Sequence, residues 1–277
     1  MKPETIRTFK VAVTLCLVCS VVVSSLAVGL KGIQEEQKEA FRQQSILEAA
    51  GLWEEGGDPG KLFKDNIKAI GLDLEDHKPE GDDLSAPKFD MAKALRDPKL
   101  HEEIPKQEDV AGLKNVEIYT VVYRVPKEGP IKKLILPIRG KGLWSTLYGF
   151  VALDVEEIEE GPTHVKVAGL TYYKHGETPG LGGEVDNQLW KAKWPGKLVF
   201  DENWDVQIEV AKNATTDYQV DALSGATLTS NGVTNMLEFW LGDSGFGPYL
   251  QKLAKKDAAT QKDAATQEAA ARRAVIQ

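Results

Sequence analysis

The chain has 277 residues, enough for one sizeable domain or two small ones, and its 34 Lys and Arg against 42 Asp and Glu give a formal net charge of −8. This acidic balance argues against a nucleic-acid-binding protein, which needs a basic surface to face phosphate. The two cysteines, Cys16 and Cys19, both lie in an apolar N-terminal stretch, so the rest of the chain has no disulfide scaffold, cysteine nucleophile or thiolate zinc site.

Residues 11–30 form an apolar stretch without a charged residue, after a short N-terminus of residues 1–10. As a helix the stretch would be about 30 Å long, which matches the hydrocarbon core of a bilayer. We therefore predict a transmembrane helix. We assign no function to Cys16 and Cys19, because small thiol side chains are tolerated inside an apolar helix.

The charges around this stretch predict its orientation. Lys2, Arg7 and Lys10 precede it against one acid, Glu4, so the N-terminus is expected in the cytoplasm. The protein would then be a single-pass protein of the cell inner membrane with a large periplasmic domain. The alternative is a signal peptide cleaved after the sequence Ser25–Ala27, although the apolar run is longer than the usual core of such a peptide.

Residues 31–115 are predicted to form a helical juxtamembrane region and the first part of the periplasmic domain. A helix is expected to continue from the membrane through Gly32–Trp53 and to end near Gly51, because glycine commonly follows a helix. Short helices are expected at Leu62–Leu72 and Phe89–Arg96.

Residues 116–250 are predicted to form the main domain, because runs of β-branched and aromatic residues begin there. A hairpin is expected between Leu198–Phe200 and Trp204–Val210, and a helix is expected to begin with Ser224 as its N-cap and to end near Gly242. The fold class is therefore α+β, a mostly antiparallel sheet flanked by helices. The predicted strands are Val116–Val125, Ile131–Ile138, Thr146–Leu153 and Val165–Tyr173. Residues 251–277 form a low-complexity tail in which the sequence KDAATQ occurs twice, and we assign no site to it.

Several common functional motifs are absent from the sequence. No two of the four histidines are four residues apart and none belongs to an HExxH motif, so no metal site is predicted. The sequence contains neither of the glycine-rich signatures of nucleotide sites and no GxSxG nucleophile motif.

The segment His175–Glu184 follows a predicted strand and is rich in glycine. Gly180, Gly182 and Gly183 would allow backbone amides to approach a flat or anionic ligand closely, because no Cβ stands in the way. Glycine is also an ordinary turn residue, so a polar hairpin loop is the alternative.

The segment Asp221–Ser230 leads into the last predicted helix. Free amides at a helix start, together with several hydroxyl groups, suit a phosphate. Ser and Thr are also standard helix caps, so an ordinary helix start is the alternative.

The sequence Ser224-Gly225-Ala226-Thr227, with Asp221 three residues before it, resembles the acceptor motif of proteins that carry covalently bound FMN. In that family an FAD-dependent flavin transferase joins the FMN phosphate to the hydroxyl of the last threonine. The resemblance implies that Thr227 is the attachment site and that Asp221, Ser224, Gly225 and Ala226 are recognised by the transferase.

The segment Glu177–Gly182 resembles the flavin-contacting loop of the same family. The resemblance implies that the cofactor-binding residues include Glu177, Thr178, Gly180, Leu181, Gly182 and Leu228. Trp144 is a further candidate, as a wall for the isoalloxazine ring or, alternatively, as a core tryptophan. We expect Gly180–Gly183 to lie against the flavin, across a cleft from the helix that carries Thr227.

The single anchor, the outward domain and the sequence Gly245–Tyr249 resemble the C subunits of the Na⁺-translocating NADH:quinone reductases over most of residues 1–250. This resemblance implies a membrane-bound flavoprotein subunit that relays electrons among the other membrane subunits of a complex that oxidises NADH, reduces ubiquinone and exports Na⁺. The flavoprotein subunit of the related Rnf complex is an alternative. A non-redox periplasmic assembly or ligand-binding protein is an alternative of another class.

Overall fold

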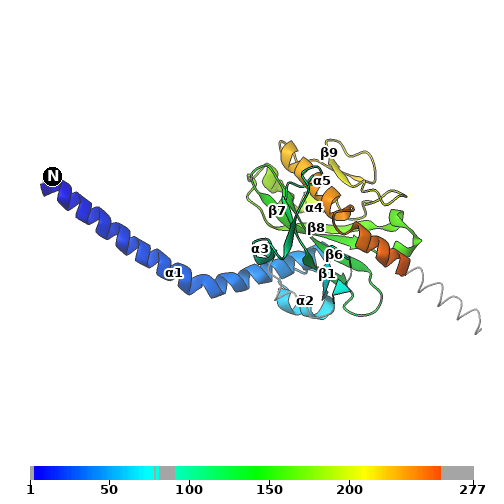
Figure 1. Cartoon of the computed structure of the whole chain (residues 1–277), viewed down its shortest axis with the longest axis horizontal. Coiled ribbons are helices and arrows are strands. Elements are labelled where there is room, and N and C mark those ends of the chain that lie inside the picture. The colour runs from blue at the N-terminus through cyan, green and yellow to red at the C-terminus, as the bar shows by residue number, and fades with distance from the viewer. Residues whose placement is uncertain (1–2, 78, 81–90, 257–277) are drawn as a thin grey trace, which may run out of the picture. The chain divides into compact units, whose positions relative to one another are not determined.

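The computed structural model describes residues 3–77, 79–80 and 91–256. The chain divides into two compact units at Gln43–Gln44. The described part of the first unit is helical throughout. The last turns of the same helix belong to the second unit, which also holds all the other labelled elements (Figure 1). The predicted tail lies mostly outside the described residues, as does the start of the helix predicted at Phe89–Arg96.

The helices differ greatly in length. The first helix, α1, ends at Ala50, next to the predicted Gly51, whose φ of +70° suits a glycine. Within the described residues, α1 alone is long and apolar enough to cross a membrane, and its most apolar window has a mean hydropathy of 2.6. The labelled helices are α1 Pro3–Ala50, α2 Pro59–Asn66, α3 Met91–Ala94, α4 Gln188–Lys191 and α5 Thr227–Leu241, with the 3₁₀ helices η1 Ile158–Glu160, η2 Pro162–His164 and η3 Gly182–Asp186. The chain is helical again over residues 247–256, where the described part ends.

The second unit is built on a six-stranded antiparallel sheet with the strand order β2-β1-β5-β6-β7-β8. The predicted α+β class with a mostly antiparallel sheet is therefore confirmed. Two small two-stranded sheets, β3-β4 and β9-β10, accompany it. The strands are β1 Lys68–Asp73, β2 Pro79–Glu80, β3 His101–Glu103, β4 Asn115–Glu117, β5 Tyr119–Val125, β6 Lys133–Lys141, β7 Thr146–Asp154, β8 Lys166–Lys174, β9 Glu209–Ala211 and β10 Gln219–Asp221.

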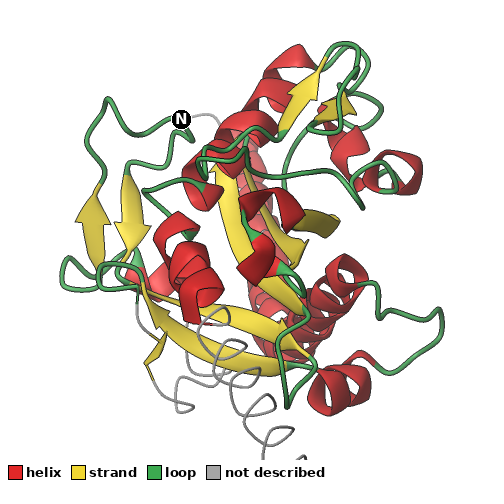
Figure 2. Cartoon of the chain, turned by 90° about the vertical axis from the view of Figure 1, so that its right-hand side faces the viewer, coloured by secondary structure: helices red, strands yellow, loops and turns green. Residues whose placement is uncertain are grey.

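Helices cover both faces of this sheet (Figure 2). Because successive side chains of a strand point to opposite faces, a strand such as β6 contributes to two clusters. In β6, Leu134 and Leu136 pack in the cluster that contains most of α5, whereas Ile135 packs in the cluster with Ile46 and Leu47 from the end of α1. Two buried layers therefore hold the sheet between the end of α1 and α5.

Four local predictions differ from the structure. The strand predicted at Val116–Val125 is divided into β4, which pairs with β3, and β5, which pairs with β1 and β6 in the main sheet. Leu62–Leu72 is not one helix: α2 ends at Asn66, and β1 follows and pairs with β5 along its whole length. The hairpin after Leu198 is present but short: Phe200 and Val206 form one antiparallel bridge flanked by backbone hydrogen bonds between the two arms, and the next strand, β9, pairs in parallel with β10. In each of these cases the backbone pairing between segments set the bounds of the element.

The fourth difference concerns the start of α5. The helix begins at Thr227 and its N-cap is Ala226, so Ser224 is not the cap. Ser224 and Gly225 instead form the middle of a turn closed by a 3.1 Å hydrogen bond from the Ala226 amide to the Leu223 carbonyl. Gly225 has a φ of +68°, as a type II turn requires at its third position. The predicted end near Gly242 is confirmed.

Candidate functional site

Three segments that are far apart in the sequence meet at the N-terminal end of α5. They are the four-residue loop 142–145 between β6 and β7, the turn 177–183 after β8, and the first turn of α5. Two of them are segments that the sequence patterns indicated. The carboxylate of Glu177 joins all three.

Glu177 is buried and accepts hydrogen bonds through both carboxylate oxygens. Oε1 accepts from the amides of Trp144 and Ser145, each at 3.0 Å, and from the Ser145 hydroxyl at 3.2 Å. Oε2 accepts from the Leu143 amide at 3.2 Å and from the Thr229 hydroxyl at 2.8 Å. One carboxylate therefore fixes a loop and a helix together.

The same hydrogen bonds keep this carboxylate charged. Burial raises the pKa of the Glu177 carboxyl, but the hydrogen bond from Thr229 and those from the three loop amides outweigh burial and hold the pKa below its ordinary value. The site therefore contains a fixed negative charge at neutral pH.

Two glycines make this close packing possible. A Cβ at residue 142 would lie 2.7 Å from Glu177 Oε1, and a Cβ at residue 182 would lie 2.6 Å from Thr229 Oγ1. Gly182 is itself buried. It therefore packs directly on the first turn of α5, and the expectation that a cleft separates the glycine turn from this helix was wrong.

A second tight turn presents the glycine segment. The Leu181 amide donates to the Thr178 carbonyl at 3.1 Å, with Pro179 and Gly180 between them. Gly180 has a φ of +75°, so this is again the pattern of a type II turn, with proline second and glycine third. The turn abuts the one before α5, since a Cβ at Gly225 would lie 3.2 Å from the Leu181 side chain.

The hydroxyl groups near the helix start fall into two classes. Thr227 and Ser224 are exposed, whereas Thr229 and Ser230 are each only 1% exposed. Thr229 donates to Glu177, and the Ser230 hydroxyl accepts from the Leu223 amide at 3.1 Å. Thr227 is the first residue of α5, where amides have no acceptor in a preceding turn, and the alanine N-cap has no side-chain acceptor to offer them.

Large apolar side chains on these segments are exposed. Trp144 is 69% exposed and Leu228 is 60% exposed, and Leu143 and Leu181 are also exposed. The alternative that Trp144 is a core tryptophan is therefore wrong. Exposed apolar side chains beside a helix start would suit a flat, partly apolar ligand.

Asp221 lies outside this cluster of contacts, at the end of β10. Its carboxylate accepts from Lys193 Nζ at 2.8 Å and from the Ala214 amide at 3.1 Å. The hydrogen bond from Lys193 is the main cause that lowers the pKa of Asp221. Its backbone carbonyl accepts from the indole of Trp190, so Asp221 ties the chain before the Ser224 turn to α4.

Sequence reasoning selected Glu177, Gly182 and Thr227, but it missed Ser145 and Leu143. The Ser145 hydroxyl donates to Glu177 and accepts from the Gly176 amide at 2.7 Å. The signal that could have pointed to them is the sequence Gly-Leu-Trp-Ser, a short polar-ended turn between two strongly predicted strands.

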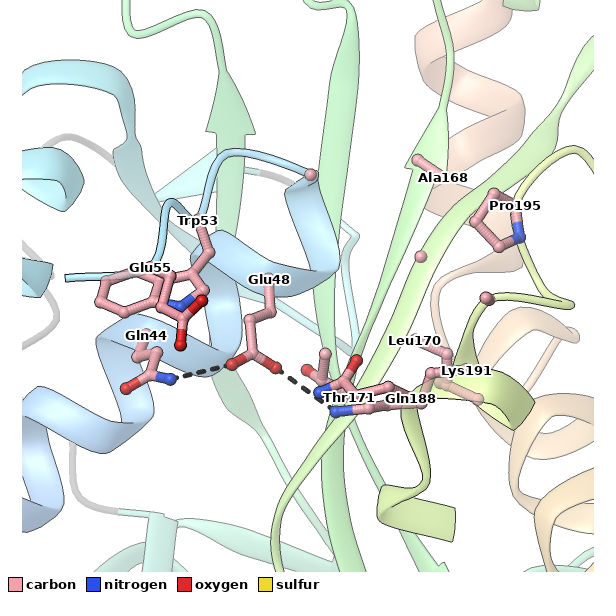
Figure 3. Close-up of a pocket in the computed structure, with 13 residues that line it drawn as sticks. Gln44, Glu48, Trp53, Glu55, Ala168, Leu170, Thr171, Gln188, Lys191 and Pro195 are labelled. Carbon is pink, nitrogen blue, oxygen red and sulfur yellow. Dashed lines mark hydrogen bonds and ion pairs between the residues drawn. The ribbon is translucent and has the colours of Figure 1, made fainter. Parts of the chain in front are cut away.

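A separate groove of about 740 Å³ lies along β8, between the end of α1 and α4 (Figure 3). Glu48 and Lys191 face each other across it at 3.4 Å, and Gln44 donates to Glu48 at 2.9 Å. None of the predicted site residues lines this groove. We therefore place the candidate site at the start of α5.

Among the described residues, one group of side chains that could ligate a metal comes together on the surface. Ligand atoms of Glu157, Glu160 and His164 lie within 4.8 Å of one another, although sequence spacing predicted no metal site. His164 pairs with both glutamates. These contacts explain the cluster as surface ion pairing, and we assign it no function.

Comparison with known proteins places the chain among flavoproteins. The model of the FMN-binding domain family matches residues 142–242, which include all three segments of the site. The C subunit of the Na(+)-translocating NADH-quinone reductase of Pseudomonas aeruginosa is 46% identical over 92% of this chain and 98% of its own length. The Yersinia pestis protein of the same name is 44% identical over 89% of this chain and 92% of its own.

A solved structure agrees with these relatives. The crystal structure of Shewanella oneidensis NqrC matches with a TM-score of 0.69 and 29% identity, over 79% of this chain and 98% of that one. The fold and the family point to the same class of protein as the acceptor motif.

Proposed function

Because the chain belongs to the family of the C subunits of Na(+)-translocating NADH-quinone reductases, we propose that it carries FMN as a phosphoester on the hydroxyl of Thr227 and relays electrons within that complex. The protein is a membrane-anchored, single-pass flavoprotein subunit of an oxidoreductase with further subunits. The covalent bond, the electron relay and the coupling to Na⁺ export are the proposed parts.

The choice of Thr227 as the proposed attachment site rests on one observation. Of the hydroxyl residues at the start of α5, Thr227 is exposed, whereas Thr229 and Ser230 are buried and hydrogen-bonded. A transferase acting on the folded domain can reach an exposed hydroxyl but not these two. Ser224 is also exposed, but it lies in the turn before the helix.

The residues present suit a phosphate on Thr227. The amides of the first turn of an α-helix lack intrahelical acceptors and lie at the positive end of the helix dipole. A phosphate at the first helical position would accept hydrogen bonds from such amides, which is a common mode of anion binding. Gly225 allows the turn that delivers Thr227 to this position.

The exposed apolar side chains suit the flavin ring. We propose that Trp144, Leu181 and Leu228 flank it, since they are the exposed apolar side chains among the predicted cofactor-binding residues. FMN, when bound, supplies the electron-transfer chemistry, and the protein supplies position and electrostatics. Thr227 is a tether that keeps the cofactor on the protein and takes no part in electron transfer itself.

Attachment would require an FAD-dependent flavin transferase as a partner during maturation. We propose that Asp221, Ser224, Gly225 and Ala226 are recognised with Thr227. Ser224, Gly225 and Ala226 directly precede the threonine, and Ser224 and Gly225 are exposed as it is. The carboxylate of Asp221 is itself held by Lys193, so its contribution to recognition includes fixing this part of the backbone.

The proposed orientation places this domain in the periplasm. The basic N-terminus before residues 11–30 supports a cytoplasmic start. A reporter fused after residue 250 is expected to be active only if it functions outside the cytoplasm. Activity of a reporter that functions only in the cytoplasm would contradict both the orientation and a periplasmic site of flavin attachment.

The proposed cofactor attachment has a direct test. The full chain, co-produced with the flavin transferase, should give a fluorescent band that survives denaturing electrophoresis. Thr227→Ala should abolish the fluorescence, and Thr229→Ala should retain it. A wild-type chain without a fluorescent band would contradict covalent attachment and favour a non-redox function.

A further inference from the structure

Glu177 has little capacity left to bind a ligand. A carboxylate offers about four lone-pair positions. Among the described residues, five donors already reach its two oxygens, at distances between 2.8 and 3.2 Å. The side chain is also buried beneath these partners. This is not the arrangement of a residue that binds a cofactor directly.

The contacts of Glu177 connect the two proposed flavin-holding elements. Oε2 binds the hydroxyl of Thr229, which is two residues after Thr227 in the first turn of α5. Oε1 binds the amide of Trp144. The proposed tether and the proposed ring wall are thus linked through the two oxygens of one carboxylate.

Packing leaves little freedom around this link. Gly142 and Gly182 bring the backbone so close to Glu177 and Thr229 that a methyl group at either residue would overlap with them. In the middle of α5, a Cβ at Gly232 would lie 2.3 Å from the Lys141 carbonyl, directly before loop 142–145. The loop and the helix are therefore held at a fixed separation.

We propose that Glu177 is a positioning residue for the flavin: it acts through loop 142–145 and Thr229, and not by contact with the cofactor. The inference rests on the proposed attachment of FMN at Thr227. It assigns to the carboxylate the task of fixing the distance between tether and ring wall, and so of setting the flavin environment.

The first test is Glu177→Gln in the full chain. The glutamine oxygen can keep the hydrogen bonds of Oε1, but its amide nitrogen would face the Leu143 amide, so that two donors oppose each other. Covalent flavin content should stay at the wild-type level. The flavin fluorescence and reduction potential should shift, and exchange in loop 142–145 should become faster, by about tenfold at the Leu143 amide, as expected for loss of about one hydrogen bond.

The second test is Thr229→Val, which removes the hydroxyl donor and nearly keeps the shape. It should shift the same observables in the same direction. If both residues act through one link, the double variant should shift them no further than the larger single variant, because effects within one network are not additive.

The matched control is Glu117→Gln. Glu117 is another buried carboxylate, bound to Arg139 at 2.5 Å, and Arg139 lies over Trp240 near the other end of α5. Its substitution should lower stability without shifting the flavin fluorescence or the exchange in loop 142–145.

The outcomes separate this inference from the function on which it rests. Unchanged fluorescence, potential and loop exchange in Glu177→Gln, or equal shifts in Glu117→Gln, would overturn the positioning role. Loss of covalent flavin from Glu177→Gln in a folded chain would also overturn it, in favour of a part in attachment. If the wild-type chain proved to lack covalent FMN, the proposed function would fail, and loop exchange would still decide whether Glu177 fixes the loop.

Discussion

At the N-terminal end of α5 a buried carboxylate, Glu177, is held by neutral donors, whereas near the C-terminal end Glu117 is held by the guanidinium of Arg139. Arg139 also lies 5.5 Å from the centre of the Trp240 ring, and its carbonyl accepts from the Trp240 indole at 2.7 Å. Charge pairing and aromatic packing therefore stabilise the C-terminal end of α5.

The N-terminal end is left open. Thr227 is exposed there, and the helix has no side-chain cap. One helix thus separates two tasks: its C-terminal end stabilises the domain and its N-terminal end is available for a ligand. This comparison predicts that substitutions at the two ends have different effects on stability and on the flavin.

The largest effect on stability is expected at the C-terminal end. Glu117→Gln leaves the Arg139 charge without its buried counter-ion and should lower the free energy of unfolding by about 3–5 kcal/mol. Denaturant unfolding of the full chain in detergent, followed by circular dichroism, measures this change. Replacing both partners together, Glu117→Leu with Arg139→Met, should recover much of the loss. A double variant less stable than Glu117→Gln would contradict this explanation.

A smaller effect is expected from Gly182→Val at the N-terminal end. The new side chain would overlap with Thr229 Oγ1 and Glu177 Oε2, and such overpacking costs about 1–3 kcal/mol. Covalent flavin content should not change, because attachment depends on Thr227, but the flavin fluorescence should.

Gly180→Ala is the control for this substitution. It adds a methyl group in open space at a positive φ, so it introduces backbone strain without that overlap. Equal changes of flavin fluorescence in both variants would show that the overlap is not the cause.

The smallest effect is expected from titration of Glu177. Its pKa in the folded protein lies below the ordinary value of 4.5, so the charged form stabilises the fold above that value. This stabilisation should be lost as the pH falls through the lowered folded pKa. Unfolding measured between neutral pH and about pH 3 should show a weaker acid dependence in Glu177→Gln than in the wild type. An identical dependence in both would argue against a charged Glu177.

Local patterns predicted the elements whose signals are local. The strand at Thr146–Leu153 was predicted within one residue of β7, because β-branched and aromatic residues recur along it. The end of α1 was predicted from Gly51. The predicted N-cap at Ser224 was wrong because a serine beside a glycine fits a turn as well as a cap. The positive φ of Gly225 is the conformation of a turn.

The core of the site depends on contacts that no local pattern contains. Glu177 is 32 residues from Ser145 and 52 residues from Thr229, and only the folded sheet brings them together. The motif resemblance therefore selected Thr227 as the attachment site and Glu177 as a cofactor-binding residue, but no local pattern could indicate the bonds of Glu177 to loop 142–145 and Thr229.

The most direct test of this account is the position of the flavin on the peptide chain. The full chain, co-produced with the flavin transferase, would be digested, and tandem mass spectrometry would locate the modified residue. The account predicts one FMN on Thr227, the exposed first residue of α5. FMN on the buried Thr229 or Ser230 would contradict it, because attachment there would require the first turn of the helix to open and release Glu177 or Leu223.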